Sequence, residues 1–171
     1  EDKAGLLNHI TIIFNRRKIN INSLNVSTTE VNGVSRFTIV VNSSKEKIIK
    51  VVNHINKLIE VLGAFLYEED EIYFQEIALY KLSSKIFMKG DKVENIIGKY
   101  GAKILVIEKN HAIIQKTGSK DETQSLYNEL DKFNGILEFA RSGRVALSKK
   151  KRKTINFLKE LEKTKSNKLN I

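Results

Sequence analysis

Apolar residues recur first at helical and then at strand spacing along the opening part of the chain. The stretch 4–17 predicts a helix, because its apolar residues fall on one stripe made of Leu6, Leu7, Ile10, Ile13 and Phe14. The stretch 21–29 predicts a strand, and its apolar residues slip by one position between Ile21 and Leu24, which indicates a bulge. Asn32-Gly33 is a typical hairpin turn, and the strand 35–42 that follows it alternates apolar and polar residues.

A second helix and a further strand are predicted before residue 68. Ser43 and Glu46 have the spacing of a capping box at a helix start. The apolar stripe that follows them consists of Ile48, Val52, Ile55 and Ile59. Residues 61–67 (VLGAFLY) are interpreted as a strand. The element order of this first part is therefore α-β-β-α-β.

Residues 73–141 repeat this order with one additional strand in front. The predicted elements are a strand (73–83), a helix (89–100), a hairpin turning around Asn110-His111 (103–118), a helix (121–133) and a strand (135–141). The apolar faces of the two helices consist of Val93, Ile96 and Ile97 and of Leu126, Leu130 and Phe133. The order of the second part is β-α-β-β-α-β.

The two parts match if the first has lost its opening strand, which gives an internal repeat of about 70 residues. We predict an α+β fold of two ferredoxin-like (βαββαβ) units, each an antiparallel sheet with two helices on one face. We expect the opening strand of the first unit to be missing from this chain. The predicted organisation is a first domain (1–68), a polar linker (69–72), a second domain (73–148) and a basic tail (149–171).

Composition limits the classes of protein that fit. Of the 171 residues, 41 % are hydrophobic, which suffices for two small cores, and none is cysteine, which excludes disulfides and thiolate metal sites. No apolar run approaches the ~18 residues that a membrane-spanning helix needs. There is no initiator Met and no signal peptide, and we expect residues to be missing at the front.

Positive charge is concentrated at the end of the chain. Residues 141–171 hold eleven Lys and Arg but two acidic residues, whereas residues 1–140 hold nineteen basic and eighteen acidic residues. A protein that follows a phosphate backbone is expected to carry its positive charge on the folded surface that does so. This distribution places the charge on an appendage instead.

The sequence contains no recognisable active site. His9, His54 and His111 fall in three different predicted elements, and none has a carboxylate partner at a useful spacing. No Walker loop, dinucleotide fingerprint, nucleophile triad or metal-ligand spacing is present. We predict a binding or regulatory protein, not an enzyme, with no cofactor and no metal on this chain.

The stretch 94–104 (ENIIGKYGAKI) is similar to the loop by which KH domains hold single-stranded RNA. Such a loop needs a helix on both sides, and the apolar run after Lys103 has strand spacing instead. The favoured interpretation is that Gly98 loosens a helix end and Gly101 takes the left-handed position that stops it. An RNA-binding protein that uses Gly98–Gly101 and the basic tail remains the alternative.

Gly5 stands at the start of the first predicted helix. A glycine there is either a merely permissive N-terminus or a residue that lets an anion approach the free N–H groups of the first turn. Asn20, past the other end of this helix, offers amide groups to an amino or carboxylate group. One chain cannot easily bring both ends of a ~12-residue helix, roughly 18 Å long, onto one small ligand, but two adjacent chains can.

The opening of the chain resembles the regulatory (small) subunit of acetolactate synthase, also called acetohydroxyacid synthase. The residues that match this family's pattern are Glu1, Gly5, Leu7, Phe14, Arg17, Asn20, Ile21, Ser23, Leu24, Val26, Thr29, Ser35, Arg36, Thr38 and Ile39. Residues 75–82 (QEIALYKL) and 140–148 (ARSGRVALS) resemble the opening strand and the closing segment of the family's second domain. The resemblance covers about residues 1–148.

The resemblance implies an N-terminal ACT domain, a C-terminal ACT-like domain and a homodimer through the ACT domains. It also implies that a branched-chain amino acid, usually valine, binds between two ACT domains. The residues at the corresponding positions are Asp2, Gly5, Leu6, Leu7, Asn20 and Ile21. The family usually has Asn where Asp2 stands, and an acid there either repels the carboxylate of the effector or meets its ammonium group.

The implied function is to activate the catalytic subunit of acetolactate synthase and to confer feedback inhibition in the biosynthesis of valine, leucine and isoleucine. Thiamine diphosphate, Mg²⁺ and FAD are expected on the catalytic subunit, and the complex is expected in the cytoplasm. A stand-alone ACT amino-acid sensor that controls another partner is a further alternative. We expect no nucleic acid and no membrane among the partners.

Overall fold

The computed structural model describes residues 5–89 and 91–150, and the predicted basic tail falls almost entirely outside this part. The chain divides into a first unit, Glu1–Tyr73 with Ala146–Ile171, and a second unit, Phe74–Val145. The elements of the first unit are α1 (Leu6–Arg16), β1 (Ile21–Thr28), β2 (Ser35–Val41) and α2 (Lys45–Ile55). These four elements agree with the first four predicted from the sequence.

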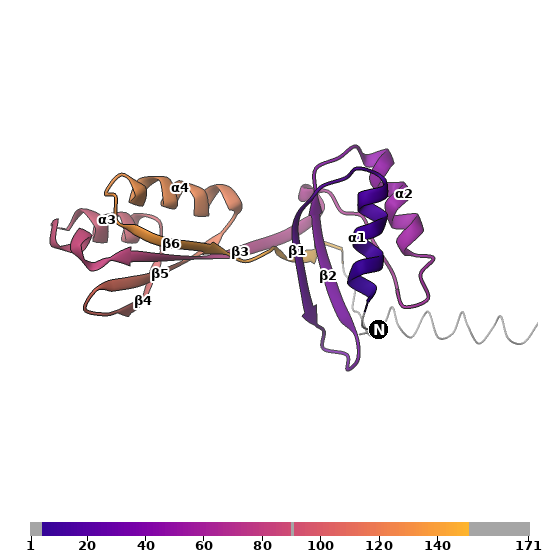
Figure 1. The fold of residues 1–171 in the computed structure, drawn as a ribbon, viewed down its shortest axis with the longest axis horizontal. Coiled ribbons are helices and arrows are strands. Elements are labelled where there is room, and N and C mark those ends of the chain that lie inside the picture. The colour runs from indigo at the N-terminus through magenta and orange to yellow at the C-terminus, as the bar shows by residue number, and fades with distance from the viewer. Residues whose placement is uncertain (1–4, 90, 151–171) are drawn as a thin grey trace, which may run out of the picture. The chain divides into compact units, whose positions relative to one another are not determined.

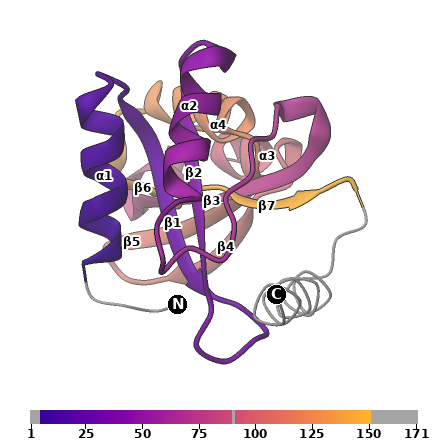
Figure 2. The same cartoon turned by 90° about the vertical axis from the view of Figure 1, so that its right-hand side faces the viewer.

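The first unit is a hairpin covered by two helices. β1 and β2 pair antiparallel, and their register shifts between Ile21 and Ser23, which confirms the predicted bulge. α1 and α2 lie on the same side of this hairpin (Figures 1 and 2). The buried core side chains come from the helices and from Ile19: Leu6, Ile10, Ile13, Phe14, Ile19, Ile48, Val51 and Ile55.

The strand predicted at residues 61–67 is wrong, because this segment forms neither strand nor helix. In the second unit, the last strand of the repeat pairs with the first strand of the repeat. Within the described residues no strand precedes α1, so the segment 61–67 has no neighbour with which to form a ladder. Its apolar side chains still pack against the core through Val61, Ala64 and Leu66.

Both ends of α2 differ from the prediction. Ser44, not Ser43, is the N-cap, and it makes no side-chain hydrogen bond, so the predicted Ser43–Glu46 capping box is wrong. The helix ends at Ile55, because the amide of Asn56 exchanges hydrogen bonds with the backbone of Ala64 (3.0 and 2.6 Å) and turns the chain back. Ile59 therefore lies beyond the helix and is 91 % exposed, not part of its apolar stripe.

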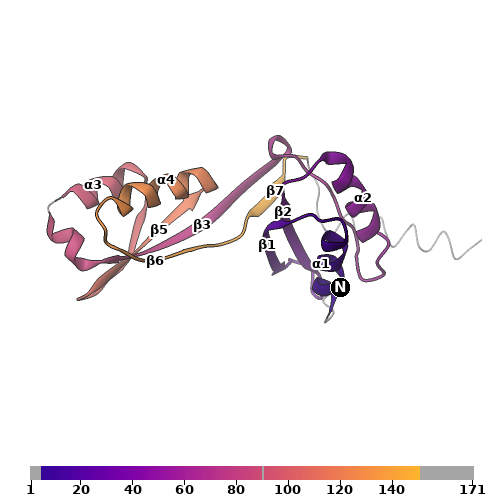
Figure 3. The same cartoon turned by 45° about the horizontal axis from the view of Figure 1, so that its top comes forward.

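The second unit is a complete β-α-β-β-α-β repeat, as predicted. Its elements are β3 (Ile72–Ser83), the 3₁₀ helix η2 (Ser84–Lys89), α3 (Lys92–Lys99), β4 (Lys103–Ile107), β5 (His111–Gly118), α4 (Lys120–Asp131) and β6 (Ile136–Arg141). The strands are ordered β4-β5-β3-β6, all pairs being antiparallel, which is the ferredoxin-like order. α3 and α4 cover one face of the sheet (Figures 1 and 3). The α+β fold class is confirmed.

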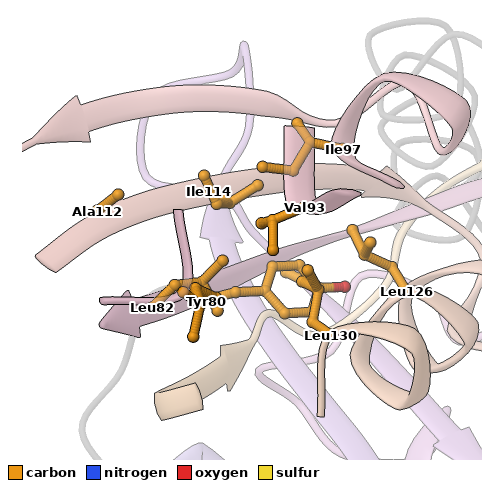
Figure 4. Close-up of a cluster of buried hydrophobic side chains, with 10 residues drawn as sticks. Tyr80, Leu82, Val93, Ile97, Ala112, Ile114, Leu126 and Leu130 are labelled. Atoms are coloured by element: carbon orange, nitrogen blue, oxygen red, sulfur yellow. The ribbon is translucent and has the colours of Figure 1, made fainter. Parts of the chain in front are cut away.

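The core of the second unit combines strand and helix residues (Figure 4). β3 contributes Tyr80 and Leu82 and β5 contributes Ile114, all with no exposed surface. The helices contribute Val93, Ile97, Leu126 and Leu130. The Tyr80 hydroxyl donates a hydrogen bond to the backbone oxygen of Thr123 (2.7 Å), so the one polar group of this side chain is satisfied inside the core.

The helix-stop interpretation of Gly101 is confirmed. Gly101 has φ +59°, its N–H donates to the carbonyl of Gly98, and the N–H of Ala102 donates to the carbonyl of Ile97. These two bonds form a Schellman motif. β4 begins two residues later, at Lys103. The second helix that a KH loop needs is therefore replaced by a strand.

Three further features of the second half were not predicted. α3 begins at Lys92, after the 3₁₀ helix η2. The β4–β5 hairpin turns at residues 108–110, one to two residues before the predicted Asn110-His111. Ser119 and Glu122 form a reciprocal capping box at the start of α4.

The boundary between the units carries a short helix and an additional strand. Glu69–Glu71 form the 3₁₀ helix η1, whose N-cap Glu68 and third residue Glu71 form a capping box. β7 (Val145–Ser148) pairs with β3, and the N–H of Lys149 donates to the carbonyl of Glu71. The acidic stretch 68–71 is thus a hydrogen-bonded turn.

Candidate functional site

Gly5 occupies a backbone position that side chains disfavour. It is the N-cap of α1 with φ +94°, in the left-handed region. The residue is exposed, and a Cβ built on it would meet no atom of the described residues within 4 Å. Glycine is therefore required here by conformation and not by crowding.

Within the described residues, no side chain caps the N–H groups in the first turn of α1. The first intrahelical bond runs from the N–H of His9 to the carbonyl of Gly5 (3.1 Å), so the N–H groups of Leu6, Leu7 and Asn8 precede it. No described side chain caps this turn, and it contains no acidic residue. The helix dipole adds positive potential at the same end. Chemically, this arrangement suits a carboxylate.

The adjacent residues Leu6 and Leu7 differ in how much of their side chains a ligand can reach. Leu6 is buried in the core of the first unit, so it offers a ligand only its backbone. Leu7 is 43 % exposed and presents an aliphatic side chain beside the helix start. An amino acid with an aliphatic side chain matches the combination of free N–H groups and an exposed leucine.

Asn20 and Ile21 lie past the other end of α1. Asn20 is exposed, and Ile21 is the half-buried first residue of β1, opposite Val41. α1 has eleven residues. Such a helix is about 16 Å long. The structure therefore does not bring Asn20 and Gly5 together within one chain, and Asp2 lies outside the described residues.

The three histidines lie on three different elements, His9 on α1, His54 on α2 and His111 on β5. His54 Nδ1 lies 3.3 Å from Arg17 Nη2, and His111 Nε2 lies 3.8 Å from Glu108. Within the part of the chain that the structure describes, no group of His, Asp and Glu could hold a metal ion. In that same part no helix is long and apolar enough to cross a membrane.

A buried ion cluster in the second unit was missed by the sequence interpretation. Glu76 is 6 % exposed, and its carboxylate lies 3.4 Å from Arg144 Nε and 3.8 Å from Arg141 Nε. Arg141 also donates to Gln124 (3.0 Å), and the Arg144 guanidinium stacks on Phe74 at 4.0 Å. The available signal was a charged residue at an inward-facing position of the predicted strand 73–83. The paired charges and hydrogen bonds of this ion cluster indicate a structural role.

Known proteins match both units of the chain. Residues 1–63 match the sequence family described as the acetohydroxyacid synthase small subunit-like ACT domain, and residues 75–150 match the small subunit of acetolactate synthase. The acetolactate synthase small subunit of Mycolicibacterium smegmatis is 34 % identical over 149 residues, covering 87 % of this chain and 86 % of that protein. This chain belongs to the acetolactate synthase small-subunit family. The sequence-based identification is thereby confirmed.

Other members of the small-subunit family agree with this assignment. The protein of the same name from Bacillus subtilis is 33 % identical over 149 residues, which are 86 % of each chain. The crystal structure of the small subunit from Thermotoga maritima superimposes with a TM-score of 0.77 at 25 % identity, covering 88 % of this chain and 93 % of that one. The ACT-type fold is therefore shared along nearly the whole described part.

Proposed function

We propose that this chain is the regulatory subunit of acetolactate synthase and that it activates the catalytic subunit and makes it sensitive to a branched-chain amino acid, valine. Membership of the small-subunit family supports the partnership with a catalytic subunit. The observation that carries the effector site is the start of α1, where Gly5 has φ +94° and no described side chain caps the first turn. No chemistry is assigned to this chain.

The effector would bind between two chains. The first-turn N–H groups behind Gly5 of one chain would hold the effector's carboxylate, and Asn20 and Ile21 of the neighbouring chain would complete the site. This arrangement is supported by the two ends of α1 being too far apart for one small ligand. It requires a homodimer through the ACT domains. Asp2, outside the described residues, would belong to the site by its position in the family, and its carboxylate would either repel the carboxylate of the effector or meet its ammonium group.

Regulation would follow from differential binding. If the effector binds the inhibited arrangement of the dimer more tightly than the activating one, it shifts the population toward inhibition. The chemistry would take place on the catalytic subunit, which would carry thiamine diphosphate, Mg²⁺ and FAD. We assign no cofactor to the small subunit and place the complex in the cytoplasm.

The first test is reconstitution. The activity of the catalytic subunit is measured with and without this chain while valine, leucine and isoleucine are titrated. We expect activation by the chain and inhibition by valine. No activation under any condition would exclude the regulatory-subunit proposal and would favour a stand-alone amino-acid sensor.

The second test is the substitution Gly5→Asp. Its carboxylate would compete for the N–H groups of the first turn, so we expect valine inhibition to be lost, with at least a tenfold rise in the inhibitory concentration, while activation is retained. Gly5→Ala introduces the strained φ without the charge and should affect inhibition less. Unchanged valine inhibition in Gly5→Asp would count against the site.

Gly101→Ala is the matched control for these two variants. Gly101 also has a positive φ (+59°) and no atom within 4 Å of a built Cβ, but it stops a helix of the second unit. We expect this variant to lose about 1 kcal/mol of stability and to keep its valine response. Calorimetry with valine on each variant separates binding from activation.

A further inference from the structure

Lys18 occupies a backbone position that favours glycine. It follows the last turn of α1 and has φ +53°. Its N–H donates to the carbonyl of Asn15 (2.9 Å), and the N–H of Ile19 donates to the carbonyl of Phe14 (3.1 Å), which together form a Schellman motif. A side chain is disfavoured at the left-handed position of this motif, because its Cβ lies too close to the following carbonyl oxygen.

Two other helices are followed by left-handed residues that suit this conformation. Gly101 (φ +59°) stops α3, and Asn134 (φ +51°) lies in the turn behind α4. Glycine has no Cβ, and asparagine is one of the few other residues that enter this region routinely. Within residues 5–89 and 91–150, Lys18 and Asn134 are the non-glycine residues with positive φ. Backbone preference therefore does not explain the lysine at the end of α1.

Contacts of the folded chain do not explain this lysine either. The Lys18 side chain is exposed, and within the described part of the chain its ammonium takes part in no hydrogen bond or ion pair. Arg17, by contrast, donates to the carbonyl of Ile13 and lies 3.3 Å from His54 Nδ1. A cation favours the negative end of a helix dipole, but Arg16 already supplies one in the last turn.

Lys18 stands at the end of α1 that carries Asn20 and Ile21. Ile19, between them, is 4 % exposed and packs into the core of the first unit, so the core holds this connection in place. The proposed effector site joins this end of α1 in one chain to the Gly5 end of α1 in the neighbouring chain. An exposed ammonium two residues before Asn20 therefore borders that site.

We propose that Lys18 is a further residue of the effector site and that its ammonium binds a carboxylate there. This inference rests on the proposed function. Two carboxylates fit the role: that of the effector, and that of Asp2 of the neighbouring chain, which lies outside the described residues. In either case the ammonium offsets negative charge in the site, so an amino acid binds more tightly.

Calorimetry with valine on the full chain and on Lys18→Gly tests this role. The substitution removes the cation and places glycine where the backbone favours it. We expect the Kd for valine to rise about tenfold, while the midpoint of thermal unfolding does not fall. A lysine that only stabilised the helix end would give the opposite result, a lower midpoint with unchanged valine binding.

The double variant Asp2→Asn/Lys18→Gly distinguishes the two carboxylates. If Lys18 pairs with Asp2, removing both charges restores the balance, and the double variant should bind valine like the natural chain. If Lys18 binds the carboxylate of the effector, the double variant should stay about tenfold weaker. Lys18→Arg keeps the cation and should keep valine binding in both cases.

Asn134→Gly is the matched control, because it places glycine at a left-handed position of the second unit, far along the chain from the effector site. It should leave valine binding unchanged. Natural valine affinity in Lys18→Gly would overturn this inference and leave the proposed function standing. Absence of valine binding by the natural chain would overturn the proposed effector site and this inference with it.

Discussion

The two units share a plan of helices on one side of a sheet but bury their strands differently. In the second unit, the central strands β3 and β5 contribute fully buried side chains such as Tyr80, Leu82 and Ile114. In the first unit, the inward-facing strand residues Phe37, Ile39 and Val41 pack against the core and stay partly exposed. The buried residues there come from α1, α2 and the connection at Ile19, and only Val51 among them is fully buried.

The difference follows from the number of neighbours each strand has. β3 and β5 have a strand on both sides, so adjacent side chains on the same face cover their inward-facing residues. β1 and β2 pair only with each other within the described part of the chain. A strand is therefore buried by its lateral neighbours as much as by the helices above it.

The largest expected effect concerns the tyrosine in the second core. Burial raises the pKa of Tyr80 from 10.0 to about 12. The folded state therefore favours the neutral hydroxyl. The contribution of the neutral Tyr80 hydroxyl to the stability of the fold is complete below pH 10 and is lost as the pH rises through about 12. The loss amounts to about 3 kcal/mol, since each pKa unit is worth 1.36 kcal/mol.

The free energy of unfolding, measured with denaturant between pH 9 and pH 12, checks this pH dependence. This range includes the ordinary tyrosine pKa of about 10. Hydrogen exchange assigns the loss to a unit, and we expect the second unit to open first. Tyr80→Phe should remove the part of the stability loss at high pH that Tyr80 causes. The variant should also be about 1 kcal/mol less stable at neutral pH, because it lacks the hydrogen bond to Thr123. An unchanged pH profile in that variant would mean that another group causes the loss.

Two valines test whether the cores differ in rigidity. Val51 on α2 and Val93 on α3 are both fully buried, one in each unit. We expect Val93→Ala to cost about 2 kcal/mol and Val51→Ala about 1 kcal/mol, because the half-exposed strands of the first unit can relax into the cavity. Thermal unfolding with unit-resolved hydrogen exchange measures the stability lost in each variant. A larger loss for Val51→Ala than for Val93→Ala would contradict the idea that the first core relaxes more easily.

The smallest expected effect on stability concerns the N-caps of α4 and α2. The Ser119 hydroxyl accepts a hydrogen bond from the N–H of Glu122, whereas Ser44 makes no side-chain cap bond. Ser119→Ala should therefore cost about 1 kcal/mol and Ser44→Ala only a few tenths. Urea unfolding of the two variants decides this, and equal losses would show that the Ser44 hydroxyl caps α2 in solution.

A further consequence concerns acid. The backbone N–H of Ser119 donates to Glu122 and holds the pKa of that carboxylate below its usual range. The stabilisation is present above the ordinary glutamate pKa and is lost as the pH falls through the lowered one. Glu122→Gln should flatten the acid limb of the stability profile.

Sequence patterns predicted what depends on neighbouring residues. The bulge after Ile21, the helix stop at Gly101 and the six elements of the second unit follow from local periodicity and backbone preference, and the structure confirms them. The capping pair at Ser119 was just as local and was overlooked. Residues 1–39, 75–82 and 140–148 also carry the family resemblance in their sequence alone, and the relatives confirm it.

Features that depend on distant partners were decided by the tertiary structure alone. Residues 61–67 have the composition of a strand, but a strand exists only beside another, and none lies beside this segment in the described residues. Ile59 continues a helical stripe, but Asn56 binds the backbone of Ala64 and ends the helix first. Glu76 is buried because two arginines more than sixty residues away reach it. By itself the sequence determined the family and the helices and strands that the structure confirms, because these follow from residues close in the chain. The loss of the strand at 61–67, the helix ends and the buried charges followed from packing, which joins residues that are far apart in the chain.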